Sequence, residues 1–262
     1  MAGSKDKEAR REAQVRLAET RKQQAAVQRR RNVIIAVVSV VVVGAIAAVV
    51  VLAISDQNAK SSSKGPTPAA ATASNGGIPH SAGPTASAAA ASGVPLVDIY
   101  EDYQCPICKQ FELTDSATVN KLAAAGKARF VYHAINIIGP NYPGTLAFTS
   151  SLRAASAAAC ASDAGKFEAF HDIAFKNQPD EGTGISDAQL ASWATQAGID
   201  SPTFTSCLDA QKYVPYAKRV DAQASDRGVT GTPTLYINGK ALAQWPQPSS
   251  LESQIAAATK KQ

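Results

Sequence analysis

The chain has few cysteines and histidines, the usual ligands of structural zinc, and outside its first 32 residues it lacks an excess of basic residues. It contains four cysteines and three histidines in 262 residues, and only two of the cysteines lie close together. A structural zinc site needs four ligands at matched spacings, so we expect no metal and no cofactor. Residues 1–32 carry a net charge of +6, whereas the rest of the chain carries −1. The basic pI therefore reflects a tail, and we expect no nucleic-acid partner.

Charge is also missing from residues 33–54, an apolar run of 22 residues rich in Val, Ile and Ala. As a helix this run would measure about 33 Å, enough to cross a bilayer. Arg29, Arg30 and Arg31 precede it, so the positive-inside rule places residues 1–32 in the cytoplasm and the chain from Ser55 onward outside. A cleavable signal peptide is the alternative, although its apolar segment is usually shorter, about 7–15 residues. We expect a single-pass protein of the cell membrane.

Residues 55–92 are rich in Ala, Ser, Gly, Thr and Pro. This composition is typical of a flexible linker that cannot form a core, apart from a possible short strand near residues 77–80. We therefore expect one folded domain over residues 93–262, held near the membrane by the linker.

The most informative stretch is Cys105-Pro106-Ile107-Cys108. Residues 95–100 are almost continuously apolar, as in a buried strand, and a helix follows from Pro106. Cys105 would then lie at a helix N-terminus, where free N–H groups and the helix dipole favour a thiolate. Cys108 lies one turn further on, so the spacing favours a redox-active pair. Half of a zinc site and a purely structural disulfide are the alternatives.

Asp98 interrupts the apolar strand, and an acid is costly to bury there. One interpretation is a partly buried carboxylate beneath the cysteine pair that transfers protons. The other is a polar residue at the strand end with access to solvent. His133 is expected to be packed or surface-facing and not catalytic, and His171 is expected to be a structural residue.

The rest of the pattern predicts an α/β frame with a block of helices, about residues 146–227, inserted midway. We expect the helix from Pro106 to break near Thr114 and a second helix to run to about Ala125, before Gly126. The other predicted elements are a strand at 128–134, helices at 147–161, 166–177, 186–197, 201–208 and 214–226, a hairpin of 235–237 with 240–243, and a helix from 249 to about 259.

This layout resembles the thioredoxin fold with the helical insertion of the DsbA-like disulfide oxidoreductases. The resemblance covers about residues 93–258 and is carried by VDIYEDYQCPIC (97–108), GKFEAFHD (165–172) and GVTGTPT (228–234). The chain is most similar to the membrane-anchored, extracytoplasmic members of actinobacteria. The resemblance implies that Cys105 attacks, that Cys108 resolves, and that Pro233 is a cis-proline. Backbone groups of Thr232 would then pair with an extended substrate.

Two features depart from that family. Asp98 lies seven residues before Cys105, whereas the family's acid usually lies six before, so the resemblance does not settle a proton-shuttle role. The dipeptide Pro106-Ile107 also lacks the histidine of the most oxidising members, which implies a milder oxidant.

The resemblance implies an enzyme that oxidises exported proteins through thiol–disulfide exchange and is itself reoxidised by a membrane partner similar to vitamin K epoxide reductase. Reductase and isomerase activities remain open. The alternative is a binding module of the same fold, a redox sensor or a metal chaperone with little turnover.

Cys160 and Cys207 lie on two predicted helices of the inserted block. Because free thiols seldom persist in an oxidising compartment, we expect a structural disulfide between them. Two separately buried thiols are the alternative.

Overall fold

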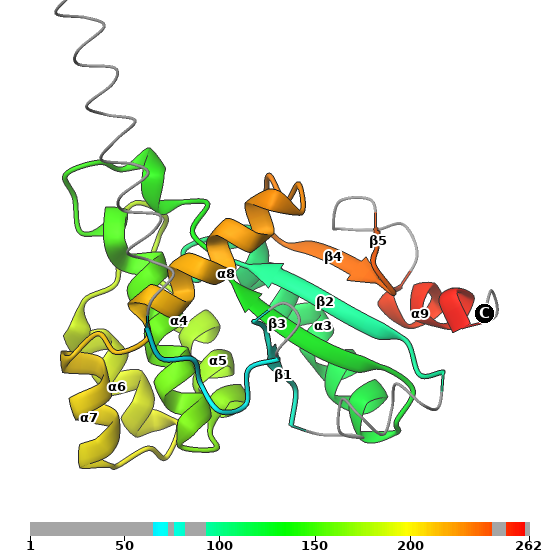
Figure 1. Cartoon of the computed structure of the whole chain (residues 1–262), viewed down its shortest axis with the longest axis horizontal. Coiled ribbons are helices and arrows are strands. Elements are labelled where there is room, and N and C mark those ends of the chain that lie inside the picture. Colours follow the sequence, from blue (N-terminus) through cyan, green and yellow to red (C-terminus); the bar gives the residue numbers. More distant parts are fainter. Residues whose placement is uncertain (1–64, 73–75, 82–92, 243–249, 260–262) are drawn as a thin grey trace, which may run out of the picture. The chain divides into compact units, whose positions relative to one another are not determined.

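A mixed β-sheet forms the frame of the described part of the chain (Figure 1). The strand order is β1-β3-β2-β4-β5, and the central strand β2 pairs in parallel with β3 and antiparallel with β4. The strands are β1 (Ile78–Pro79), β2 (Leu96–Glu101), β3 (Arg129–Ala134), β4 (Thr234–Ile237) and β5 (Lys240–Ala241). All of β2 after Leu96 is buried, as its apolar sequence predicts for a strand that is covered on both faces.

The computed structural model describes residues 65–72, 76–81, 93–242 and 250–259, all of which belong to one folded unit. The predicted basic tail and membrane-spanning segment, residues 1–54, lie outside the described residues. Within the described ranges, no helix combines the length and the apolar character needed to cross a bilayer.

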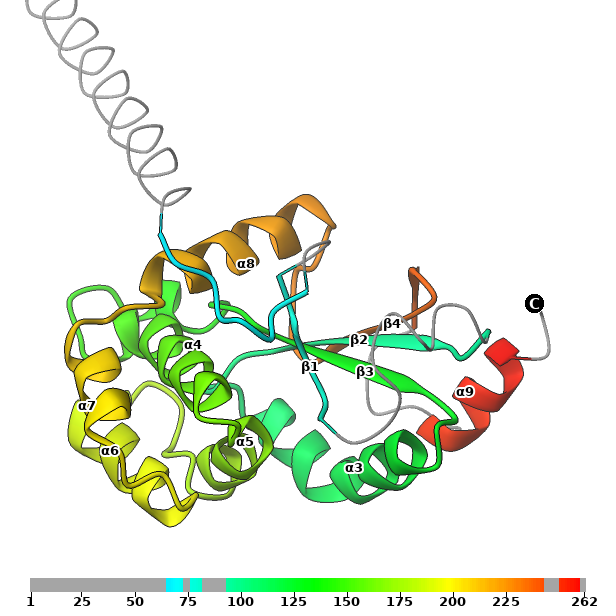
Figure 2. The same cartoon turned by 60° about the horizontal axis from the view of Figure 1, so that its bottom comes forward.

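Helices cover the sheet on both faces, as Figure 2 shows. Helices α3 and α9 lie against one face and α8 against the other, while α4 to α7 gather at one end of the sheet. The predicted α/β frame with an inserted helical block is thereby confirmed. The elements are α3 (Pro106–Ala124), the 3₁₀ turn η1 (Gly139–Asn141), α4 (Ala147–Asp163), α5 (Phe167–Lys176), α6 (Asp187–Gln196), α7 (Pro202–Asp209), α8 (Val214–Asp226) and α9 (Leu251–Thr259).

Helix α3 is continuous, and the predicted break near Thr114 is wrong. The Thr114 hydroxyl donates to the carbonyl oxygen of Gln110, one turn back in the same helix, at 2.9 Å. This local bond lets threonine remain inside a helix, where it does not act as a cap. Helix α3 ends where predicted, before Gly126, which adopts the left-handed conformation with φ of 64°.

Part of the predicted linker belongs to the folded unit, whereas we expected order to begin near Gly93. Strand β1 pairs antiparallel with β3 at the edge of the sheet, and Ile78 is only 5% exposed. The backbone of Gly77 runs so close to β3 that a Cβ atom there would lie 2.3 Å from Cγ1 of Val131. The possible short strand near residues 77–80 is thus confirmed as β1. Composition nevertheless assigned the segment to the linker, because it contributes few apolar side chains and only a short stretch of pairing.

The helical block is closed by a disulfide between Cys160 on α4 and Cys207 on α7. The two cysteines are 47 residues apart in the sequence. Closing a loop of that length restricts the unfolded chain and stabilises the fold by about 4 kcal/mol in the loop-entropy model. Helix α6 begins with the predicted capping box of Ser186 and Gln189.

Because Ile78 is buried in the folded unit, shortening its side chain should destabilise the fold. For residues 61–262, we expect Ile78→Ala to lower the free energy of unfolding by about 2–4 kcal/mol, because a buried side chain is lost and a cavity remains. The matched control is Leu113→Ala, at a side chain that is 61% exposed, with an expected change within about 0.5 kcal/mol. Urea unfolding followed by circular dichroism measures both, and equal effects would show that the segment is a linker.

Candidate active site

Cys105 and Cys108 lie at the junction of β2 and α3. Cys105 is the N-cap of α3 in an extended conformation, and Pro106 occupies the first helical position. The backbone N–H of Cys105 donates to the carbonyl oxygen of Asp102 at 2.9 Å, which closes the turn. Both cysteines are free thiols, with 5% of Cys105 and none of Cys108 exposed. Cys105 is thus the more accessible of the two, although less open to solvent than the helix start suggested.

The two sulfurs differ in acidity. A hydrogen bond from the Cys108 thiol, with further help from the N–H groups of Ile107 and Cys108, lowers the pKa of Cys105 to about 6, against the opposing effect of burial. Burial raises the pKa of Cys108 well above the ordinary thiol value, and the bond to Cys105 and the charge of Glu101 raise it further. At neutral pH, Cys105 is therefore the thiolate and Cys108 the protonated thiol.

The loop before β4 lies next to Cys105. The peptide bond between Thr232 and Pro233 is cis, and the Cys105 thiol donates to the carbonyl oxygen of Thr232 at 3.4 Å. Pro233 is buried, while Thr232 is half-buried. The structure thus brings together Cys105, Cys108, Thr232 and Pro233, which are far apart in the sequence.

The helical block fixes the turn that carries Cys105. The side-chain amide of Gln178, which follows α5, donates to the carbonyl oxygens of Tyr103 and Cys105 at 2.9 and 3.0 Å. Lys109 in turn donates to the carbonyl oxygen of Gln178 at 3.1 Å. Nothing in the sequence marks Gln178 as a site residue, because it lies in a loop without a motif.

The alternation of side chains along β2 places its acids on opposite faces of the sheet. Glu101 shares a face with Val97 and Ile99, and this face is covered by α3. Asp98 and Tyr100 point to the other face, where Arg227 at the end of α8 meets both of them. This parity was available in the sequence, and it would have singled out Glu101 as the acid on the cysteine side.

Asp98 forms ion pairs on its own face of the sheet. Its carboxylate lies 3.1 Å from Nε2 of His133 and 3.0 Å from Nη1 of Arg227. Burial opposes the charge, but the hydrogen bonds and charges of these two partners hold the pKa of Asp98 below its usual value. Asp98 is buried, so it is not a solvent-exposed strand end. Its part in proton transfer stays a prediction.

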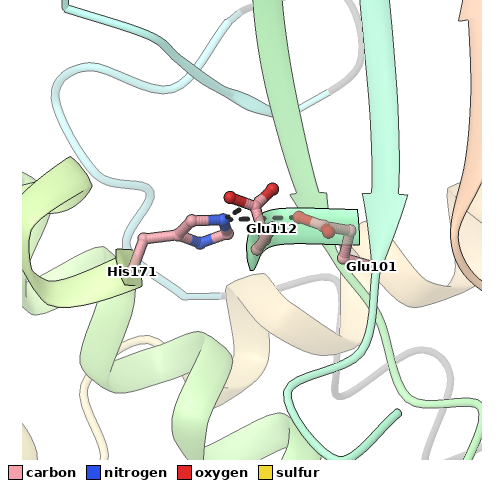
Figure 3. A group of neighbouring side chains, drawn as sticks. All are labelled: Glu101, Glu112 and His171. Atoms are coloured by element: carbon pink, nitrogen blue, oxygen red, sulfur yellow. Dashed lines mark ion pairs between the residues drawn. The ribbon is translucent and has the colours of Figure 1, made fainter. Parts of the chain in front are cut away.

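A second charged cluster lies on the α3 side of the sheet (Figure 3). Glu101 ends β2, Glu112 follows Cys108 by one turn of α3, and His171 comes from α5. Nε2 of His171 lies 3.3 Å from Glu101 and 3.5 Å from Glu112. Burial, reinforced by the charge of Glu112, raises the pKa of Glu101 to about 8. His171 is packed as expected, but it belongs to a charged cluster that the sequence analysis did not predict.

The comparisons agree with this geometry. The family model described as Thioredoxin matches residues 89–257. The reduced disulfide bond oxidoreductase DsbG of Mycobacterium tuberculosis is 30% identical, with a TM-score of 0.53, and the match covers 63% of this chain and 77% of that chain. The oxidised DsbA of the same organism is also 30% identical, with a TM-score of 0.53 and coverage of 63% and 83%.

Two curated relatives match only in part. The protein named Na(+)/H(+) antiporter NhaA 3 of Salinispora tropica is 28% identical and NhaA 1 of Salinispora arenicola is 30% identical, each over 142 residues. These matches cover 54% of this chain but only 20% of each relative.

The difference in acidity predicts the alkylation behaviour of the reduced protein. Cys105 should reach half of its maximal rate near pH 6, because only the thiolate reacts, whereas Cys108 should remain slow to well above pH 9. By linkage, the contribution of Cys105 to the stability of the reduced form grows between about pH 6 and the ordinary thiol value of 9.0, and it is lost as the pH falls through 6. Mass spectrometry of each cysteine peptide across pH measures the rates, with Cys160 and Cys207 as unlabelled controls. Faster labelling of Cys108 at neutral pH would reverse the assignment.

Proposed function

Because the chain belongs to the thioredoxin family, as one of its DsbA-like thiol–disulfide oxidoreductases, we propose that it forms or exchanges disulfide bonds in exported proteins. The Cys105–Cys108 pair carries the exchange, and a single membrane helix at residues 33–54 anchors the enzyme.

The main support for this proposal is that the pKa of Cys105 is lowered while the pKa of Cys108 is raised. A pKa of about 6 makes Cys105 a stable thiolate and a good leaving group, since thiols of low pKa leave faster in exchange. Burial keeps Cys108 protonated and away from other thiols until Cys105 has reacted. A purely structural disulfide would not need this difference in pKa between its two cysteines.

In the oxidised enzyme the exchange takes two steps. A substrate thiolate attacks Sγ of Cys105, a mixed disulfide forms, and the bond to Cys108 breaks so that Cys108 takes up the electron pair and then a proton. A second substrate thiolate then attacks the substrate sulfur of the mixed disulfide and expels Cys105 as a thiolate. The substrate loses two electrons and two protons, of which one proton goes to Cys108 and the other to solvent. The reduced enzyme then holds a Cys108 thiol and a Cys105 thiolate, and a membrane redox partner must reoxidise the pair.

Apolar side chains beside the cysteines suit an unfolded substrate. Ile107 is 43% exposed, and Leu146 and Phe148 are similarly exposed at the start of α4. The amide of Gln104 donates to the carbonyl oxygen of Ala147 at 2.9 Å, so this end of α4 lies next to the active-site turn. Such exposed apolar groups bind other chains, and the backbone of Thr232 would pair with the same extended segment.

An extracytoplasmic site is supported by the second disulfide and by the sequence before the domain. The bond between Cys160 and Cys207 is of a kind that persists in oxidising compartments. Residues 33–54 are long and apolar enough to span a bilayer, with Arg29, Arg30 and Arg31 on the cytoplasmic side.

Cysteine variants test the exchange. With a reduced two-cysteine peptide, the wild-type protein should form the peptide disulfide over many turnovers when an external oxidant is supplied. Cys105→Ser should abolish activity, because the attacked sulfur is gone. Cys108→Ser should accumulate a long-lived mixed disulfide at Cys105, seen as an added peptide mass that dithiothreitol removes. Full activity of Cys105→Ser, or oxidation of no more than one peptide per chain by the wild-type protein, would contradict the enzymatic proposal.

Reporter fusions after Lys260 test the topology. An alkaline phosphatase, which needs disulfides formed outside the cytoplasm, should be active, whereas a β-galactosidase at the same position should be inactive. Replacing Arg29, Arg30 and Arg31 with alanine should weaken this bias, because these charges set the orientation. The reverse pattern of reporter activities would place the domain in the cytoplasm.

A further inference from the structure

The cluster of Glu101, Glu112 and His171 is poorly satisfied for groups so deep in the protein. All three side chains are buried, with His171 5% exposed and each glutamate 3% exposed. None of the four carboxylate oxygens of Glu101 and Glu112 has a hydrogen-bond partner, and Nε2 of His171 has none either. Buried polar atoms are nearly always hydrogen-bonded, and each exception costs about 1–3 kcal/mol or more when charged. Because five such atoms lie close together, the cluster is a candidate binding site for a ligand that would satisfy them.

Their spacing matches a metal coordination shell better than it matches hydrogen bonds. One nitrogen and two carboxylate oxygens lie within 4.8 Å of one another, and the nitrogen is 3.3 and 3.5 Å from the two oxygens. Ligands at about 2.0–2.1 Å from a tetrahedral zinc ion are separated by about 3.3 Å. The three residues come from β2, α3 and α5, as Figure 3 shows, so they are held on three packed elements.

Tyr103 supplies the outer contact that metal-binding histidines usually have. Its hydroxyl lies 3.0 Å from Nδ1 of His171 and is buried. With its proton on Nδ1 and donated to the hydroxyl oxygen of Tyr103, His171 presents Nε2 as the free lone pair, in a fixed ring orientation. In Figure 3, Nε2 of His171 points between the carboxylates of Glu101 and Glu112.

Charge and space favour a small divalent cation. In the part of the chain that the structure describes, His171 is the basic group recorded in an ion pair with either carboxylate. Binding a metal releases the protons of its ligands, and two carboxylates with a neutral imidazole would then balance an ion of charge +2. A cavity of about 10 Å³, lined in part by Glu101, Tyr103 and His171, adjoins the cluster. This is about the space that one water needs, and a water would complete four ligands.

We propose that Glu101, Glu112 and His171 bind a divalent transition-metal ion of the zinc type, with water as fourth ligand, beneath the cysteine pair. Calcium and magnesium fit poorly, because they require six or more oxygen ligands or several bound waters. This site goes beyond the proposed thiol exchange, and it differs from the sequence expectation, which considered the C-x-x-C pair alone as a zinc ligand.

The test uses the full chain in detergent with its Cys105–Cys108 pair oxidised, so that thiols cannot bind the metal. After incubation with Zn²⁺ and dialysis, we expect one zinc per chain by elemental mass spectrometry and a rise in the melting temperature. Co²⁺ in its place should give the visible absorption of a four-coordinate N/O site. Glu112→Gln and His171→Gln should each lose the stoichiometric metal and the absorption. Glu168→Gln, on the same helix as His171 but outside the cluster, is the matched control and should keep both.

Tyr103→Phe keeps all three ligands and tests the outer contact. We expect its zinc dissociation constant to rise about 10–100-fold, which calorimetry measures even if a ligand variant fails to fold. Metal that is absent from the wild-type protein, or that remains equally bound in Glu112→Gln and His171→Gln, would overturn the proposal. Because the cysteines stay oxidised, neither result bears on the thiol exchange.

Discussion

The carboxylate of Asp102 joins the parts of the fold that meet at the cysteines. It is fully buried and accepts four hydrogen bonds, from the backbone of Gln104, Ile137 and Ile138 and from the hydroxyl of Ser151, at 2.6–2.8 Å. These donors belong to the active-site turn, to the segment after β3 and to α4. Hydrogen bonds to a charged group contribute about 1.5–3 kcal/mol each, so one side chain couples the sheet, the turn and the helical block. The position of Cys105 depends on this coupling.

Buried charge is divided between the two faces of the sheet. On the α8 face, Asp98 pairs with His133 and Arg227, and this arrangement holds the end of α8 beside the loop that leads to β4. On the α3 face, Glu101 faces a second carboxylate and one imidazole without good hydrogen bonds. Paired buried charges stabilise the fold. Buried polar atoms without hydrogen bonds beside a reactive sulfur are instead candidates for binding a ligand or exchanging a proton. The charges on the α8 face therefore stabilise the fold, whereas those on the α3 face form a candidate binding site.

Most of the frame could be predicted from local pattern. The strands around the cysteine pair, the capping box at Ser186 and the end of α3 before Gly126 follow from periodicity and capping, which depend on neighbours within one turn. The break at Thr114 was wrong because threonine can bond back within its own helix. The sequence indicated a possible short strand near residues 77–80 but not its partner, because β1 pairs with β3, about 50 residues away, and composition does not report such contacts.

For the site, the sequence by itself determined the chemistry of the reactive pair. Cys105 and Cys108 are one turn apart at a helix start, so the helix N–H groups and the neighbouring thiol lower the pKa of Cys105 through local geometry. The burial that raises the pKa of Cys108 comes from tertiary packing. Tertiary structure decided which distant groups reach them. Glu101, Glu112 and His171 converge only because β2, α3 and α5 pack together, and packing between elements sums many weak contacts that no short stretch of sequence encodes.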